Sequence, residues 1–158
     1  FHPEGDVYRH TRLMIGRLKK PPVVLAFGCL LHDIGKPRTF RRGRDRIRFD
    51  GHDRGGAAMA EKLLERLRFS NDLKKRIVAC VEGHMRFKDV KQMRLSTLKR
   101  FMGLATFPEQ MRLHRADCMG SHKDLGNWRF LRRKLKQIPP REIKPKPIIT
   151  GHDLLEAG

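Results

Sequence analysis

The chain has 158 residues, of which 39% are hydrophobic and 34% are charged. That length suits one compact domain with a buried core and is too short for two domains. Lysine and arginine together number 36 against 17 aspartate and glutamate residues, which gives a net charge of +19 at pH 7. Such a surplus excludes a preference for cationic partners and favours polyanions, bound in a salt-sensitive way. We therefore expect a phosphorylated nucleotide or a nucleic acid as the partner.

The cysteines and the apolar segments indicate where the protein resides. Cys29, Cys80 and Cys118 lie within apolar helical patterns, and no two are spaced as Cys-x-x-Cys, so we expect buried thiols in a reducing compartment. No apolar run approaches the roughly 20 residues that cross a bilayer, and the N-terminal residues carry no secretory pattern. We expect a cytoplasmic protein without membrane association. Because the chain begins at Phe1 without a methionine, we also expect it to be a piece of a longer protein.

Hydrophobic periodicity predicts an all-α protein of about six to eight helices. In the first half we expect helices over residues 7–18, residues 23–31 up to His32-Asp33, residues 54–67, and a segment from a Ser70 or Asn71 cap to Gly83-His84. In the second half we expect helices over residues 96–102, from a first turn at Pro108 through Gly120, and over a basic segment that contains Trp128, Leu131 and Leu135.

The connecting segments are predicted from glycine and proline. Gly35 and Pro37 are expected to terminate the second helix, and residues 38–50 to be irregular, with at most a short hairpin around Arg42-Gly43. Four prolines between Pro139 and Pro147 predict a non-helical, extended strap on the surface. We assign residues 1–138 to one domain. Residues 139–158 then form the strap and the start of a C-terminal segment that continues beyond the chain.

Six polar residues fall on apolar helix faces or at helix ends, where they are expected to point inward and to converge on one point. They are His10, His32, Asp33, His52, His84 and Asp117. Burying such groups without partners is costly, and a divalent metal would compensate all of them at once. Imidazole and carboxylate ligands without a thiolate favour Mn²⁺, Fe²⁺, Co²⁺, Ni²⁺, Zn²⁺ or Mg²⁺ over Ca²⁺. Six ligands suit either one ion or two, the latter bridged by Asp33 at about 3.5–4 Å separation.

The segments "HPEGDVYRHT", "LLHDIGKP", "FDGHDRGGAAMA" and "ITGHDLL" resemble the HD superfamily of metal-dependent phosphohydrolases, and within it the HD portion of bacterial tRNA nucleotidyltransferases and their poly(A) polymerase relatives. The resemblance implies a helical bundle in which His10, His32, Asp33 and Asp117 are the core metal ligands. It also implies that His52 and His84 serve a second metal. The implied activity is a phosphodiesterase or phosphatase acting on nucleotides or RNA ends, with tRNA as a plausible partner.

The expected mechanism rests on a metal-activated water that attacks phosphorus. Asp33, His52 and His84 are the candidate catalytic residues, and His52 or His84 can act either as a metal ligand or as a general acid. Lys36 and Arg54 are candidates to bind the phosphate. Lys36 can equally well interact favourably with the negative end of the helix dipole at the helix C-terminus.

The remaining histidines and the basic runs are not expected to take part in catalysis. His2, His114, His122 and His152 lie on polar or terminal segments and are not expected to be ligands. The basic runs 41–44 and 132–134 favour polyanion contact over a purely solvated role. With one tryptophan and one tyrosine, RNA binding is expected to use backbone and shape rather than stacking.

The chain contains no Asp-x-Asp pair of the kind that holds the polymerase metals of the tRNA enzymes. We therefore expect no nucleotidyltransferase active site here. Two alternatives to an RNA-end hydrolase stay open: a catalytically idle HD module that binds tRNA within a nucleotidyltransferase, and a hydrolase of signalling nucleotides. The sequence leaves the oligomeric state open.

Overall fold

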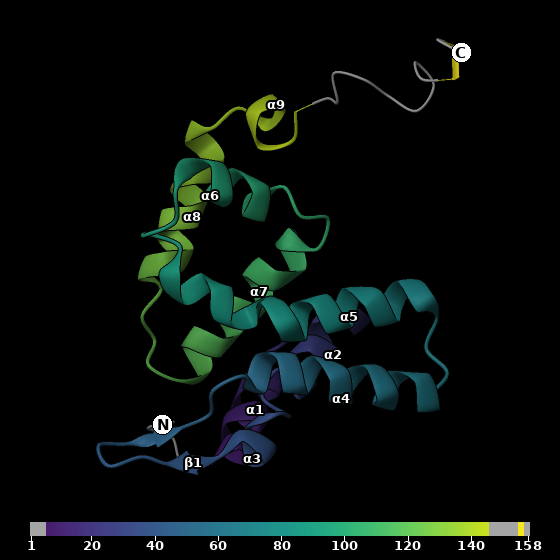
Figure 1. Ribbon diagram of the computed structural model, residues 1–158, viewed down its shortest axis with the longest axis vertical. Coiled ribbons are helices and arrows are strands. Elements are labelled where there is room, and N and C mark those ends of the chain that lie inside the picture. Colours follow the sequence, from purple (N-terminus) through teal and green to yellow (C-terminus); the bar gives the residue numbers. More distant parts are fainter. Residues whose placement is uncertain (1–5, 146–154, 157–158) are drawn as a thin grey trace.

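The computed structural model describes residues 6–145 and 155–156 (Figure 1). Predictions about His2, His152 and most of the "ITGHDLL" segment lie outside the described residues. Where described, the chain is mostly helical, and the predicted all-α class is confirmed. The helices are α1 (Val7–Gly16), α2 (Val23–Leu31), α3 (Lys36–Thr39), α4 (His52–Arg66), α5 (Asn71–Gly83), the 3-10 helix η1 (His84–Asp89), α6 (Leu95–Met102), α7 (Phe107–Gly120), α8 (Gly126–Gln137) and α9 (Pro140–Ile143).

The helices bury two apolar clusters, and α7 contributes to both. The first core is formed by α1, α2, α4 and α5, and α7 adds Leu113 to it. The second core is formed by η1, α6, α7 and α8, with Phe107 and Met111 coming from α7. In Figure 1, α4 and α5 run side by side at one end, and α6, α8 and α9 lie at the other. None of the described helices is both long and apolar enough to cross a membrane.

Local signals define several helix ends. Of the two predicted caps of α5, Ser70 is the one that caps it, and Asp6, which we had given no role, caps α1, its carboxylate accepting the backbone N–H of Arg9 at 2.7 Å. Pro108 lies in the first turn of α7. The predicted hairpin consists of β1 (Arg41–Arg42) and β2 (Ile47–Arg48), which pair antiparallel.

We predicted that Gly35 and Pro37 would end the helical structure, but a further helix begins at Lys36, between them. α2 ends at Leu31, as expected, but α3 begins at Lys36 after a short turn and includes residues predicted to be irregular. Pro37 lies in the first turn of α3, where a missing N–H costs no helical hydrogen bond. Gly35 allows a close approach, because a Cβ atom there would lie 2.2 Å from the carbonyl oxygen of His52.

The strap prediction was wrong for Pro140–Ile143, which form the single-turn helix α9. Proline is compatible with the first helical position, and Pro140 occupies it. Ile143 packs against the second core, which fixes this turn on the body of the protein. Residues 146–147 of the predicted strap lie outside the described part of the chain.

Candidate metal centre

The six predicted ligands lie in two groups of three rather than around one point. One group contains His10, His32 and Asp117, and the other contains Asp33, His52 and His84. Within each group, one ligand atom from each residue lies within 4.8 Å of the others. The separation follows from the helix ends: His32 and Asp33 are consecutive residues after α2, and their side chains point to different groups.

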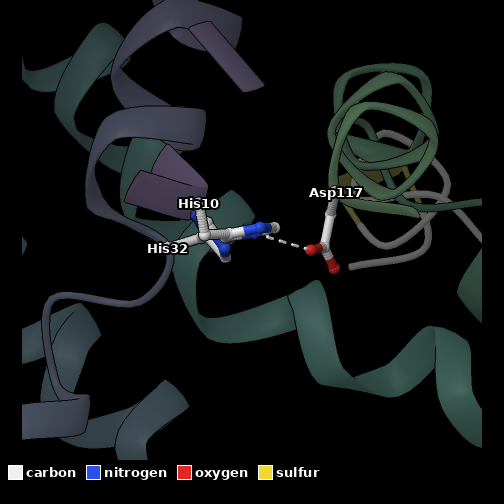
Figure 2. A group of neighbouring side chains, drawn as sticks. All are labelled: His10, His32 and Asp117. Atoms are coloured by element: carbon white, nitrogen blue, oxygen red, sulfur yellow. Dashed lines mark ion pairs between the residues drawn. The ribbon is translucent and has the colours of Figure 1, made fainter. Parts of the chain in front are cut away.

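The first group joins α1, α2 and α7 (Figure 2). His10 lies on the buried face of α1 with Met14, and both are fully buried. Its Nε2 lies 3.0 Å from Oδ1 of Asp117, which α7 presents near its C-terminus. The Asp117 side chain keeps 27% of its surface exposed, so this group is reachable from solvent on one side.

The second group joins the end of α2 to the start of α4 and the end of α5. Asp33 Oδ1 lies 3.5 Å from His52 Nε2 and 3.7 Å from His84 Nε2. His52 is the first residue of α4, and His84 directly follows α5. All three side chains are buried, and a buried aspartate is rare unless it is paired.

Asp33 is the residue that connects the two groups. Its Oδ2 lies 3.2 Å from Nε2 of His32 in the first group, while its Oδ1 faces the second. Oδ2 also accepts a hydrogen bond from Nζ of Lys36 at 2.6 Å. A carboxylate shared in this way is what bridging two cations requires.

Three of the histidines are oriented in the same manner. The Nδ1 atoms of His32, His52 and His84 lie 2.9, 2.7 and 2.6 Å from the carbonyl oxygens of residues 29, 49 and 81, each three residues earlier. An N–H donated from Nδ1 leaves a lone pair on Nε2, the arrangement that protein histidines adopt when they bind metals. In each case Nε2 faces the other ligand atoms of the two groups.

The residues present fit a divalent cation. The Nε2 atoms of His52 and His84 are 3.1 Å apart, so two lone pairs would repel unless a cation or a proton lies between them. The buried Nε2 of His32 likewise has no hydrogen-bond partner among the described residues, although a carboxylate oxygen is close. A set of imidazole and carboxylate donors suits Mn²⁺, Fe²⁺, Co²⁺, Ni²⁺ or Zn²⁺.

Protonation equilibria favour the metal-binding forms of His84 and Asp117, whereas the pKa of His32 is shifted in the opposite direction. Burial, together with the neighbouring His32, lowers the pKa of His84 to about 4, so its ring is neutral at pH 7. Burial alone would raise the pKa of Asp117, but the hydrogen bond from His10 and the charge of His32 outweigh it and lower that pKa. For His32 itself, burial lowers the pKa, and the adjacent carboxylates of Asp33 and Asp117 outweigh it and raise it.

The thiols are not part of the donor set. Burial raises the pKa of each cysteine to about 12, so the thiols stay protonated at neutral pH. The prediction that Cys29, Cys80 and Cys118 are buried core residues is confirmed.

The two predicted phosphate-binding residues differ in position. Lys36 is buried and bound to Asp33, and its Nζ also lies 5.6 Å from the ring centre of Phe49. Arg54 is exposed and lines a separate cavity of about 520 Å³ with Glu82 and other residues, none of which belongs to the two ligand groups. The structure therefore brings Lys36 to the candidate centre and leaves Arg54 outside it.

A cavity of about 240 Å³ borders one ligand of each group, His84 and Asp117. Lys88, His122 and Asp124 also line it, and our reading of the sequence gave none of them a role at the site. Lys88 follows His84 by four residues, a spacing that would place both on one side of a helix and offered a usable signal. His122 Nδ1 accepts the backbone N–H of Asp124 at 3.0 Å, so a neutral His122 ring carries its proton on Nε2.

We expected His114 to lie on a polar segment. Instead it is buried against the second core. Its ring stacks on Phe87 with 4.4 Å between centroids, and burial lowers its pKa to about 4. The spacing of Phe107, Met111, His114 and Cys118 marks one buried helix face and could have revealed this. His114 belongs to neither ligand group, in agreement with the prediction that it is not a ligand.

The chain is similar in sequence to several tRNA nucleotidyltransferases. The chain is 31% identical to the A-adding tRNA nucleotidyltransferase of Deinococcus radiodurans over 95% of its length, which is 37% of that protein. It is 30% identical to the multifunctional CCA protein of Alkalilimnicola ehrlichii and 28% identical to the CC-adding tRNA nucleotidyltransferase of Thermus thermophilus, over 72% and 85% of the chain. These matches cover 28% and 31% of the two relatives, so the chain spans about a third of their length. No solved structure gives a significant match.

A model of the HD domain matches residues 6–141, a range that includes all six candidate ligands. The helical fold with its His32-Asp33 doublet agrees with that match. The chain therefore belongs to the HD domain family.

Proposed function

We propose that the chain is a metal-dependent phosphohydrolase that cleaves phosphate mono- or diesters on nucleotides or on tRNA and other RNA ends. The observation that carries the proposal is the placement of Asp33, a buried carboxylate that contacts both groups of ligand atoms. HD domains as a family are associated with divalent metals, and the two groups provide donors for one or two ions.

His10, His32 and Asp117 would hold one ion, His52 and His84 a second, and Asp33 would contribute to both. Ions bound there would supply Lewis-acid chemistry, activating a water and polarising a phosphoryl oxygen. Lys36 orients Asp33, since its Nζ donates to Oδ2 at 2.6 Å. The low pKa of His84 favours its role as a neutral ligand over that of a general acid.

The cavity beside His84 and Asp117 is the route by which a phosphate ester would reach the ions. Lys88 at its edge is exposed and can balance the charge of a phosphoryl oxygen. The N–H at Nε2 of His122 can donate to the same group. A volume of about 240 Å³ is small for a ligand pocket and suits a phosphorylated sugar end.

A second candidate is a catalytically idle HD module that binds tRNA as part of a larger nucleotidyltransferase. The observation that favours it is the likeness to proteins that are themselves named tRNA nucleotidyltransferases, of which the chain spans about a third. Nucleotide addition is not proposed for the residues of this chain, which lack an Asp-x-Asp pair.

Metal content and hydrolysis separate the two candidates. Protein purified without chelator is assayed for divalent ions by mass spectrometry, and then for cleavage of bis-p-nitrophenyl phosphate with added Mn²⁺ or Ni²⁺. We expect bound metal and hydrolysis, and we expect Asp33→Asn to lose both. Asp72→Asn on the exposed side of α5 removes an equal charge and should lose neither. Bound metal without hydrolysis of any ester would support the idle module, and no metal at all would overturn the proposal.

A further inference from the structure

A continuous basic surface lies on the side of α7 that faces α1 and α8. A cavity of about 660 Å³ has an apolar floor that includes Leu18, Leu25 and Trp128. Its rim carries four arginines, Arg17 of α1, Arg112 and Arg115 of α7, and Arg132 of α8. A second cavity of about 230 Å³ shares Trp128 and Arg132 and adds Arg129, Arg133 and Lys136. We call these seven cationic residues together the basic face.

Within the described part of the chain, no ion pair balances the charges of the basic face, although the charge of Arg112 contributes to lowering the pKa of Glu109. No aspartate or glutamate is among the described residues that line either cavity. Among all described residues, none forms an ion pair with any of the seven cations, and all seven are exposed. Elsewhere arginines are paired, as Arg76 is with Glu109 and Arg48 with Asp45. Unpaired like charges repel one another, and a polyanion laid along the surface would relieve that repulsion.

The cations are held in a defined arrangement. The guanidinium carbons of Arg132 and Arg115 lie 4.8 and 5.6 Å from the ring centre of Trp128, which is half-buried between α7 and α8. Along α8, Arg129, Arg132, Arg133 and Lys136 follow at helical spacing and form one row. At 1.5 Å per residue, this row spans about 10 Å.

We propose that the basic face binds the phosphate backbone of RNA. The proposal rests on the proposed function only in taking RNA as the substrate class. A mononucleotide would use few of seven cations spread over three helices, whereas a strand offers one phosphate per nucleotide. A membrane surface is a poorer fit, because the one large aromatic side chain of the face is covered by two guanidinium groups rather than free to insert.

The basic face and the metal centre use residues of the same helices. Arg115 and Asp117 lie two residues apart on α7 and therefore on different sides of that helix, and Arg17, the C-cap of α1, follows His10 by seven residues. Two of the three helices that contribute to the first ligand group, α1 and α7, therefore also contribute to the basic face. RNA bound there would contact helices that also hold part of the candidate centre, which deepens the substrate assignment from a phosphate ester to an RNA.

The single tryptophan of the chain makes a direct test available. Chelator-treated protein is titrated with an RNA stem-loop that carries a single-stranded 3′ end, at NaCl concentrations from 50 to 200 mM. Trp128 emission excited at 295 nm and the anisotropy of labelled RNA are recorded together. We expect one saturable curve from both signals and an affinity that falls by tenfold or more across this salt range. Binding that leaves the Trp128 emission unchanged would overturn the proposal.

Two matched triple variants localise the binding. Arg115→Gln/Arg132→Gln/Arg133→Gln removes three charges from the basic face, and Lys62→Gln/Arg66→Gln/Lys75→Gln removes three from the exposed sides of α4 and α5. We expect the first to weaken RNA binding at least about tenfold and to lower the salt slope by about two, and the second to change affinity less than threefold. Equal losses, or tighter binding to anionic vesicles or polyglutamate than to RNA, would overturn the proposal. Because no metal is present, a failed hydrolase assay would not affect this result.

Discussion

The Nε2 atoms of His52 and His84 lie 3.1 Å apart, although each ring directs its Nδ1 at a backbone carbonyl. Neutral rings in that arrangement place two lone pairs against each other inside a buried site, close to the carboxylate of Asp33. A divalent ion removes the conflict, because it accepts both lone pairs and is attracted by the carboxylate. The arrangement therefore predicts that the folded protein is more stable with metal than without it.

The first prediction concerns metal removal. We expect EDTA to lower the melting temperature and Mn²⁺, Ni²⁺ or Zn²⁺ to restore it, with a gain of about 2.7 kcal/mol when free metal is 100 times its dissociation constant. Differential scanning calorimetry measures both states. His84→Ala should reduce this gain in stability. A melting temperature that changes neither with chelator nor with added metal would contradict the metal centre.

The second prediction concerns Lys36, whose ammonium group neutralises Asp33 in the absence of metal. Lys36→Met leaves a buried carboxylate without this partner, so we expect the metal-free protein to lose about 3–5 kcal/mol of unfolding free energy. Added metal should recover part of the loss, because it offers Asp33 another positive charge. Urea denaturation with and without metal measures this coupling. The exposed Lys62→Met is the control, and an equally small effect of both variants would show that Lys36 does not support Asp33.

The third prediction concerns Gly35. A Cβ atom at this position would lie 2.2 Å from the His52 carbonyl oxygen and 2.7 Å from the Gly56 nitrogen, and both are backbone atoms that cannot rotate away. Gly35→Ala must therefore push the start of α4 outward and move His52, at a cost of about 1–3 kcal/mol or more. Chemical denaturation measures the loss, and a lower metal affinity reports the displaced ligand.

Gly55→Ala is the matched control for that substitution. Gly55 lies within α4, and nothing would approach its added Cβ within 4 Å. Because alanine favours a helix interior over glycine by about 0.5–1 kcal/mol, this variant should be more stable than the parent. If Gly35→Ala were also stabilising, the close contact between the α2–α3 turn and α4 would not exist.

The sequence was sufficient for most of the helices and for pointing the candidate ligands inward, because both depend on local patterns. His10 shares a face with Met14, and His84 follows the buried residues of α5, so periodicity alone pointed them inward. The division into two groups was not predictable, since it depends on how the consecutive residues His32 and Asp33 direct their side chains after α2 ends.

The cavity residues and the proline segments show two further limits of the sequence. The spacing of Lys88 from His84 was a local signal, but His122 lies beyond the end of α7 and joins the cavity only through the packing of α7 against η1, which no local pattern contains. The number of prolines predicted an extended strap that includes Pro140. Proline is compatible with the first turn of a helix, however, so its position rather than its frequency decides whether a helix forms.

The last prediction concerns acid stability through an ion pair between helices. Arg76 of α5 donates a hydrogen bond to Glu109 in the first turn of α7. Burial alone would raise the pKa of Glu109, but the hydrogen bond and charge of Arg76 outweigh it and lower that pKa. A folded pKa below the unfolded value, which is about 4.3 for glutamate, stabilises the protein at pH values above 4.3. That contribution is lost as the pH falls through the lowered folded pKa.

We therefore expect Glu109→Gln to lower the melting temperature at pH 7 and to approach the parent protein as the pH falls below about 4. Thermal unfolding between pH 3 and pH 7 measures both curves, and Arg76→Gln should give the same convergence because it removes the other partner. Asp72 lies 3.5 Å from Arg76 but is largely exposed, so Asp72→Asn should leave the pH dependence nearly unchanged. Parallel curves for Glu109→Gln and the parent across the whole range would show that this pair does not link α5 to α7.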